Sequence, residues 1–352
     1  MKISGISTPA LILDVNILKA NAEKMRQLLE GTNLQLRPHY KSHKCAAIAK
    51  WQIASGAIGM TCAKLSEAED LCDAGVEDIL IANQITDPVK IRRLTDLAGN
   101  CRLTVCVDDP ENVEALATAA ANSGNIVHCL VEYDIGMSRC GVMTEGEVLA
   151  LAQQIAQKEF LSFRGIQAYA GHLSHMEDPV QRKESTAGNY RRLQSLIAYL
   201  ESNGVAVKTV SGGSTGTSTI KAAEGLYTEL QAGSYLFMDA TYRNLGLPFE
   251  NALFLLSSVV SRRGDVTILD AGVKTCGVDQ GMPALAEGTA QIAANEEHLQ
   301  LRGYSEEKRL GDKIRLIPGH CCSTVNLHDK IYLVDGEKVV DRISVTARMI
   351  GR

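Results

Sequence analysis

Several features are missing from this 352-residue sequence, and each absence narrows the class of protein. No apolar run approaches membrane-spanning length, and the start, Met1-Lys2-Ile3-Ser4-Gly5, lacks the apolar segment of a signal peptide. The formal net charge of -5 argues against nucleic acid or an anionic membrane as a main partner. With 45% hydrophobic and 22% charged residues, the chain has the composition of a globular protein of about two domains.

A disulfide framework is also not expected, although the chain has ten cysteines. A chain of this length is not a small disulfide-stapled domain. Cys62, Cys106 and Cys129 lie inside apolar, strand-like runs, where cysteine acts as a small buried residue. We therefore expect a protein of the reducing cytoplasm.

Apolar runs that alternate with helix-like stretches predict eight βα units, the arrangement of a (β/α)₈ barrel over residues 8–241. The expected strands cover residues 8–14, 34–36, 57–62, 78–82, 103–107, 126–133, 163–169 and 207–212. From residue 242 to 352, strand-like runs with few helical patterns predict a separate antiparallel β domain, joined by residues 1–7.

The segment Arg37-Pro38-His39-Tyr40-Lys41-Ser42-His43-Lys44 follows the second expected strand. The C-terminal ends of barrel strands carry the chemistry of barrel enzymes. Partial burial there lowers the pKa of an amine, and a neutral amine forms a Schiff base with an aldehyde. Lys41 is therefore a candidate catalytic residue, and the alternative is a solvated basic patch.

Arg139 follows the sixth expected strand and should also lie at the mouth of the barrel. Arginine stays protonated in any surroundings, so Arg139 could donate a hydrogen bond to a pyridine nitrogen. An ion pair with Glu132 or Asp134 is the alternative.

The seventh expected strand ends at Tyr169, and Gly171-His172-Leu173-Ser174-His175 follows. Two histidines and a tyrosine on one loop are candidate acid–base groups near neutral pH. We expect one of the two histidines to be a hydrogen-bonded structural residue.

Two glycine-rich loops come late in the expected barrel, at residues 211–217 and 231–235. Small residues let backbone N–H groups converge on an anion, and barrels often bind phosphate after the last two strands. Two tight turns are the alternative, but the pair of loops favours a phosphate site.

The segment Pro318-Gly319-His320-Cys321-Cys322 follows a strand of the expected β domain. In extended backbone, residues two apart lie on one side, with about 6–7 Å between their Cα atoms. Imidazole and thiolate are a suitable ligand pair for zinc. The alternative is a buried cysteine pair beside a surface histidine.

These motifs together resemble the D-threonine aldolase / D-serine dehydratase family of fold-type III pyridoxal-phosphate (PLP) enzymes, over nearly the whole chain. The resemblance rests on residues 37–44, Gly136-Met137-Ser138-Arg139-Cys140-Gly141-Val142, Tyr169 with the histidine loop, and residues 318–326. It implies an alanine-racemase-like barrel with a β domain, a homodimer, PLP on Lys41, and a divalent metal on His320 and Cys322. Zinc is the expected metal, with manganese or magnesium as alternatives.

The resemblance also implies roles for the remaining candidates. Arg139 would face the pyridine nitrogen, Tyr169 would line the cofactor, and the two glycine loops would hold the phosphate. The loop residues concerned are Ser214, Thr215, Gly216, Thr217, Gly233, Ser234 and Tyr235.

Within this family the resemblance separates two reactions. Aldolases carry aspartate at the second metal position, whereas dehydratases for D-serine and D-threo-3-hydroxyaspartate carry cysteine, as Cys322 does here. Residues 163–169 and 229–239 look closest to the hydroxyaspartate-acting members, foremost the dehydratase. That subgroup includes aldolases as well, so this part of the resemblance does not decide the reaction. We therefore predict elimination of water from a D-3-hydroxy amino acid (D-threo-3-hydroxyaspartate, D-serine or D-threonine), with Lys41 removing the α-proton.

An aldolase, in which His175 could act as base, is the first alternative.

The segment at residues 295–298 lacks a glycine that the family often has near the metal, so no role is assigned to His298. Three more remote alternatives fit the sequence less well. A racemase of this fold needs no metal, so the predicted metal pair argues against it. A non-enzymatic PLP carrier lacks the β domain, and a metal hydrolase would have no use for Lys41.

Overall fold

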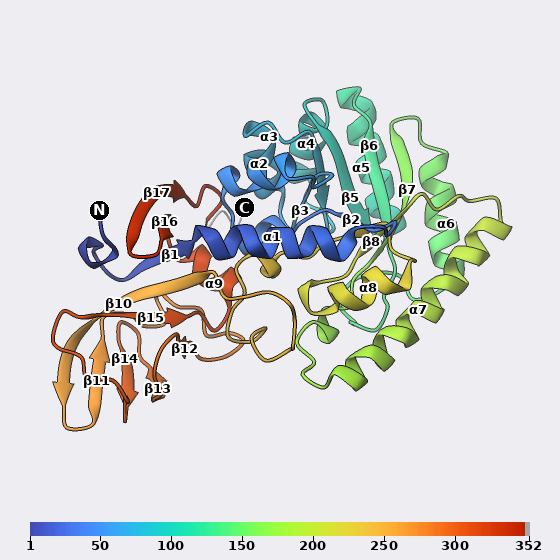
Figure 1. Cartoon of the computed structure of the whole chain (residues 1–352). Coiled ribbons are helices and arrows are strands. Elements are labelled where there is room, and N and C mark those ends of the chain that lie inside the picture. Colours follow the sequence, from blue (N-terminus) through green and yellow to red (C-terminus); the bar gives the residue numbers. More distant parts are fainter. Residues whose placement is uncertain (349–352) are drawn as a thin grey trace. The chain divides into compact units, whose positions relative to one another are not determined.

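A computed structural model describes residues 1–348, which form two compact units. Among the described residues, the barrel unit contains residues 28–41 and 48–233, and the β unit contains residues 1–27, 42–47 and 234–348. Each unit has its own sheet (Figure 1). Across residues 1–348 no helix has the length and apolar character needed to cross a bilayer.

The barrel unit holds eight parallel strands in the order β2-β9-β8-β7-β6-β5-β4-β3. The strands are β2 (Gln35–Leu36), β3 (Met60–Cys62), β4 (Asp78–Ile81), β5 (Arg102–Val107), β6 (Val127–Glu132), β7 (Leu161–Ala168), β8 (Thr209–Gly212) and β9 (Glu229–Leu230). The central strands β5 and β6 are buried on both faces along most of their length, as expected of strands covered on both sides. The curled parallel sheet and the separate β unit confirm the predicted fold class.

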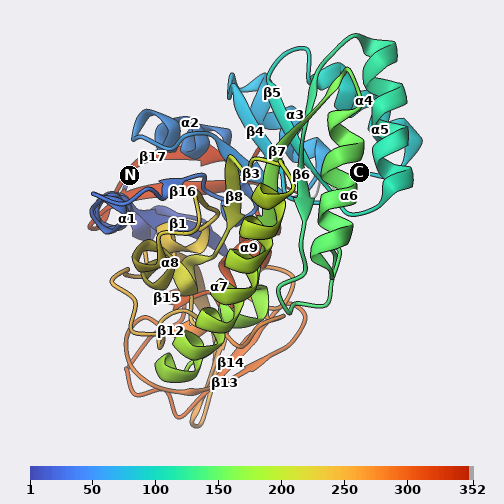
Figure 2. The same cartoon turned by 90° about the vertical axis from the view of Figure 1, so that its right-hand side faces the viewer.

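Helices follow most of these strands and lie along the outside of the sheet (Figure 2). They are α2 (Ala46–Ala54), α3 (Leu65–Asp73), α4 (Pro88–Leu97), α5 (Pro110–Ser123), α6 (Glu145–Ala156), α7 (Pro179–Ser202) and α8 (Ser218–Glu224). Asp87, Asp109 and Asp178 cap α4, α5 and α7, each followed by proline at the first helical position. The aspartate accepts the exposed N–H groups and the proline fixes φ, so Asp-Pro marks these starts in the sequence.

The barrel closes between β2 and β3, where no full ladder forms. A single bridge joins His39 to Thr61, supported by hydrogen bonds from Thr61 N to Pro38 O (2.9 Å) and from Thr61 Oγ1 to Arg37 O (3.0 Å). Ile58 N adds a third bond to Leu36 O, at 3.0 Å. These contacts hold the strand that leads to Lys41.

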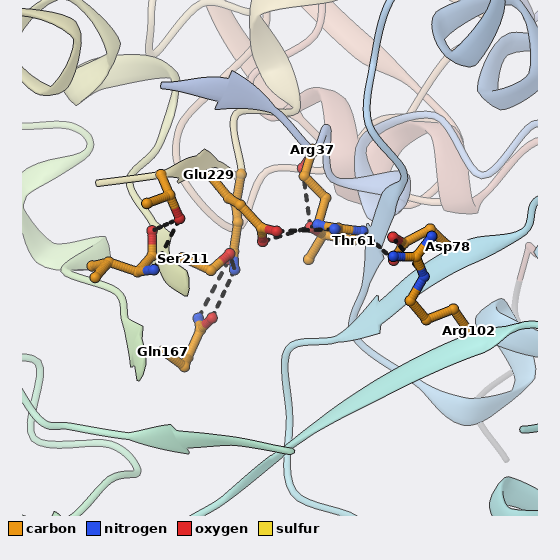
Figure 3. Close-up of polar contacts among 10 residues, drawn as sticks. Arg37, Thr61, Asp78, Arg102, Gln167, Ser211 and Glu229 are labelled. Carbon is orange, nitrogen blue, oxygen red and sulfur yellow. Dashed lines mark hydrogen bonds and ion pairs between the residues drawn. The ribbon is translucent and has the colours of Figure 1, made fainter. Parts of the chain in front are cut away.

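The side chain of Arg37 reinforces this closure from a buried position (Figure 3). Its Nε and one terminal nitrogen each lie 2.9 Å from an oxygen of Glu229, and the other terminal nitrogen lies 2.8 Å from Asp78 Oδ1. The carboxylates raise the pKa of Arg37 despite the opposing effect of burial. Arg37 thereby joins the strands that carry Glu229 and Asp78 on either side of the seam.

The β unit holds a nine-stranded sheet. Its strands are β1 (Ala10–Asp14), β10 (Leu253–Arg263), β11 (Val266–Leu269), β12 (Ala284–Leu285), β13 (Gln291–Ala294), β14 (Leu299–Arg302), β15 (Lys313–Ile317), β16 (Lys330–Asp335) and β17 (Lys338–Ser344). Two further helices are α1 (Val15–Leu29), which begins in this unit, and α9 (Cys321–Asn326). Most strand pairs are antiparallel, as predicted, and β1 with β16 is a parallel pair.

Two predicted strand assignments were wrong. The run at residues 8–14 was expected to open the barrel, but β1 pairs with β10 and β16 in the other sheet. The eighth barrel strand is instead β9, two residues that precede the second glycine loop. Both runs are largely buried, and burial alone does not show which sheet a strand joins.

Candidate functional site

Lys41 lies where the chain leaves β2. The backbone passes through buried His39 and Tyr40 into a 3₁₀ turn, Tyr40–Ser42. Lys41 N donates to His39 Nδ1 at 3.3 Å, and the Tyr40 hydroxyl donates to Asp70. The Lys41 side chain is half-buried rather than part of a solvated patch, and its Nζ lies 5.8 Å from the ring centre of Tyr169.

Tyr169 and Arg139 come from the ends of neighbouring strands, β7 and β6. The Arg139 guanidinium carbon lies 5.6 Å from the Tyr169 ring centre, so this ring has a cation from each of two loops nearby. Gly171 makes this packing possible, since a Cβ there would lie 2.7 Å from the Tyr169 ring. The barrel unit thus brings Lys41, Tyr169 and Arg139 together, as the sequence predicted for the mouth.

Arg139 also approaches Glu132, the ion pair considered as an alternative. The nitrogen–oxygen distance is 3.8 Å and the Arg139 side chain is 48% exposed, so the pair contributes at most about 1 kcal/mol. Burial raises the pKa of Glu132, against hydrogen bonding from Gln84 and the charge of Arg139, which both lower it. This contact leaves the guanidinium able to bind a further acceptor.

Asp134 organises the loop that carries Arg139. Its Oδ1 accepts hydrogen bonds from the backbone N–H groups of Gly136, Met137 and Ser138, at 2.8–3.2 Å. Burial alone would raise the pKa of Asp134, but these N–H groups hold it below its usual value. From the sequence alone, this structural role could not be separated from that of Glu132.

The first glycine loop forms a tight, buried turn after β8. Ser214 N donates to Thr217 Oγ1 at 3.1 Å, and Ser214, Thr215 and Thr217 are all buried. Gly216 packs against the histidine loop so closely that a Cβ would lie 1.9 Å from Ser174 O. Small residues are therefore required here for packing as well as for any ligand.

The histidine loop contributes a hydroxyl that the sequence did not single out. Ser174 Oγ is buried and has no hydrogen-bond partner among the described residues. His175 is half-buried and His172 is exposed. A buried hydroxyl beside a loop of small residues fits a polar ligand such as the phosphate of PLP.

Two of the proposed phosphate ligands, Ser234 and Tyr235, belong to the β unit and follow Gly233 directly. Tyr235 is fully buried, with its ring 5.7 Å from that of Phe249. Ser234 Oγ lies 3.9 Å from Cys322 Sγ. Ser234 is thus a neighbour of the predicted metal ligand within the β unit.

His320 and Cys322 come together in the β unit, although the expected extended backbone between them was wrong. His320 is extended, but α9 begins at Cys321, so Cys322 lies in the first helical turn. Burial alone would lower the pKa of His320, but its hydrogen bonds to Cys322 and Asp279 and their charges raise it to about 9. Within residues 1–348 no group of three His, Cys, Asp or Glu side chains is arranged to hold a metal.

The donor chemistry of this pair nevertheless fits a cation such as zinc, which takes imidazole and thiolate ligands with water in an open position. Asp279, which the sequence did not suggest, lies 2.7 Å from His320 Nδ1.

None of the ten cysteines forms a disulfide in the described part of the chain, and Cys62, Cys106 and Cys129 are fully buried as predicted.

The curled parallel sheet of the barrel unit, with a separate, largely antiparallel β unit, places the chain in the alanine-racemase-like class of folds. A model of the alanine racemase N-terminal domain matches residues 13–241, and a model of a putative serine dehydratase domain matches residues 252–334. The first match covers most of the chain.

Individual relatives narrow the class. D-threonine aldolase from Arthrobacter sp is 38% identical over 99% of this chain and 95% of its own. 3-hydroxy-D-aspartate aldolase from Paracoccus denitrificans (strain Pd 1222) is 37% identical over 98% and 93%. The chain therefore belongs to the family that contains these aldolases together with D-serine and hydroxyaspartate dehydratases.

Solved structures show the same relationship. The crystal structure of D-threonine aldolase from Filomicrobium marinum has a TM-score of 0.97 and 36% identity, over 100% of this chain and 98% of that one. D-threo-3-hydroxyaspartate dehydratase from Delftia sp. HT23 has a TM-score of 0.89 and 26% identity, over 100% of both. Two further structures of that dehydratase are alanine mutants of a histidine and of a cysteine two positions later, the cysteine mutant in the metal-free form.

Proposed function

We propose that the chain is a PLP- and metal-dependent lyase that eliminates water from a D-3-hydroxy amino acid, giving a keto acid and ammonia. The observation that carries the choice of elimination is Cys322, which hydrogen-bonds with His320. The same histidine–cysteine spacing occurs in the mutated pair of the Delftia dehydratase. D-threo-3-hydroxyaspartate is the first substrate to test, followed by D-serine and D-threonine.

Lys41 is the residue that would bind PLP covalently, since it is a half-buried amine close to Tyr169. PLP, when bound, supplies an electron sink for the substrate's α-carbon. Arg139 would donate a hydrogen bond to the pyridine nitrogen and, being always charged, would keep that nitrogen unprotonated. Tyr169 would line the ring, and the loops with Ser214, Thr215, Gly216, Thr217, Gly233, Ser234 and Tyr235 would hold the phosphate.

The Lys41 amine then has a second task, which is to take the proton from the substrate's α-carbon. His320 and Cys322 would hold the metal, which supplies a Lewis acid for the 3-hydroxyl. Loss of the α-proton and of hydroxide amounts to one water molecule. The resulting enamine takes up one water molecule and releases ammonia, which leaves the keto acid.

Aldol cleavage is the second candidate, because the aldolase relatives are 37–38% identical and the dehydratase structure is 26% identical. In that reaction His175 would remove the proton of the 3-hydroxyl. The bond between Cα and Cβ would break, and the products would be glycine and an aldehyde. The same Lys41, Arg139 and metal pair would serve both reactions.

Product analysis separates the two. Protein loaded with PLP and Zn²⁺ is incubated with D-threo-3-hydroxyaspartate, D-serine and D-threonine, and ammonia and glycine are assayed separately. Ammonia and keto acid without glycine would support the dehydratase. Glycine with an aldehyde would overturn elimination and would mean that a thiol ligand does not mark the reaction in this chain.

The remaining expectations form part of the same proposal. We propose zinc as the metal because thiolate ligands favour it over magnesium or manganese. We also propose a homodimer of the reducing cytoplasm, where the Cys322 thiol would remain available to the metal. Native mass spectrometry of the zinc-loaded protein would test both the metal and the assembly.

A further inference from the structure

Asp279 lies beside the proposed metal ligands and has no role in the function described so far. It comes from the loop between β11 and β12, 41 residues before His320. One carboxylate oxygen, Oδ2, lies 2.7 Å from His320 Nδ1. The other, Oδ1, accepts a hydrogen bond of 2.5 Å from Ser323 Oγ, in the first turn of α9.

The backbone around His320 is fixed by other contacts. The N–H of Cys321 donates to Asp239 Oδ2 at 3.0 Å, and Asp239 is fully buried. Gly319 packs against the backbone of Gly281, where a Cβ would lie 2.0 Å from the Gly281 oxygen. With the main chain held in this way, rotation of the His320 ring about its side-chain bonds is the freedom left for Asp279 to restrain.

We propose that Asp279 is a positioning residue that fixes the His320 ring, with Nδ1 occupied and Nε2 directed to the metal. This inference rests on the proposed metal site. A carboxylate that accepts a hydrogen bond from Nδ1–H sets the tautomer of the ring and makes the other nitrogen a better metal donor. Asp279 is not proposed as a third metal ligand, because within residues 1–348 no three His, Cys, Asp or Glu side chains are arranged to hold a metal. It would instead act through His320.

The alternative is that the contact between Asp279 and His320 is a surface ion pair with no effect on metal binding. The Asp279 side chain is 53% exposed, whereas that of His320 is 16% exposed. Breaking an exposed ion pair of this kind changes the free energy of unfolding only slightly. The two possibilities differ in metal affinity, which a purely structural contact would leave unchanged.

The test is the zinc affinity of the full chain, measured by competition with a chromophoric chelator. Asp279→Asn and Asp279→Ala should each bind zinc about 10- to 100-fold more weakly than the wild type. Ser323→Ala is the matched control. It removes the other hydrogen bond to Asp279 but leaves the contact with the imidazole, so its zinc affinity should stay within about threefold of the wild type.

Each outcome has a defined meaning. Asp279 variants that bind zinc as tightly as the wild type, while Cys322→Ala binds it weakly, would overturn the inference and leave the proposed function standing. A wild type that binds no zinc would overturn both. Thermal melting of the metal-free variants checks folding, and using two substitutions at position 279 keeps the test decisive if one of them unfolds.

Discussion

The buried guanidinium of Arg37 closes the barrel unit, and replacing it gives a quantitative test of that closure. In Arg37→Met the side chain keeps much of its volume but loses its charge. Glu229, whose side chain is 9% exposed, is then left without the cation that it contacts through both oxygens. Removing one partner of a buried pair costs about 3–5 kcal/mol.

Asp78 is less affected, because Arg102 remains 3.4 Å from its other oxygen. The loss of 3–5 kcal/mol corresponds to a fall in melting temperature of about 6–20 °C for a unit of this size. Differential scanning calorimetry is the suitable assay, since it measures the melting temperature and the unfolding enthalpy directly.

Two further variants make the comparison specific. Arg37→Met combined with Glu229→Gln removes the stranded charge and should recover part of the stability. Arg93→Met breaks an exposed pair with Glu69 and should cost at most about 1 kcal/mol. If Arg37→Met melted within about 2 °C of the Arg93 variant, the buried network would not be what closes the seam.

Three other predictions concern the ligands. Lys41→Ala should lose the visible absorbance of bound PLP, and a retained visible band would refute the covalent role of this lysine. Cys322→Ala should lose metal, measured by atomic absorption, and elimination activity while still binding PLP; full activity in metal-free wild type would argue against the metal. Gly216→Ala should weaken PLP binding at least tenfold in a fluorescence titration, because its Cβ would meet Ser174 O, whereas Gly188→Ala, in open space, should not.

The parts of the fold that depend on local sequence were predictable. Helices that begin with Asp-Pro, such as α5, carry their start signal in the local sequence, because capping involves residues only two or three apart. The pairing of β1 was not predictable, because it depends on β10 and β16, far along the chain. The short strand β9 was hidden because two residues carry no periodicity.

The candidate site divides in the same way. The sequence predicted that Lys41, Tyr169 and Arg139 lie close together, because loops after parallel strands meet at one edge of the sheet. The structure places both cations near the Tyr169 ring. Asp279 was missed because it lies in no distinctive motif. Ser174 lies within the histidine loop but was missed because its surroundings are set by tertiary packing. Geometry was needed to see that His320 pairs with Cys322 through the start of a helix.

The placement of β1 has a consequence for biosynthesis. Its apolar residues are synthesised before their partners, since Leu11 pairs with Leu255 and Ile331, and Asn16 donates to Asp335, 319 residues later. At about 5–20 residues per second the delay is on the order of 15–60 s. During that interval the nascent chain carries an unpaired hydrophobic strand. Slow elongation or a scarce chaperone supply should therefore lower the soluble yield of this protein, even where its active site is intact.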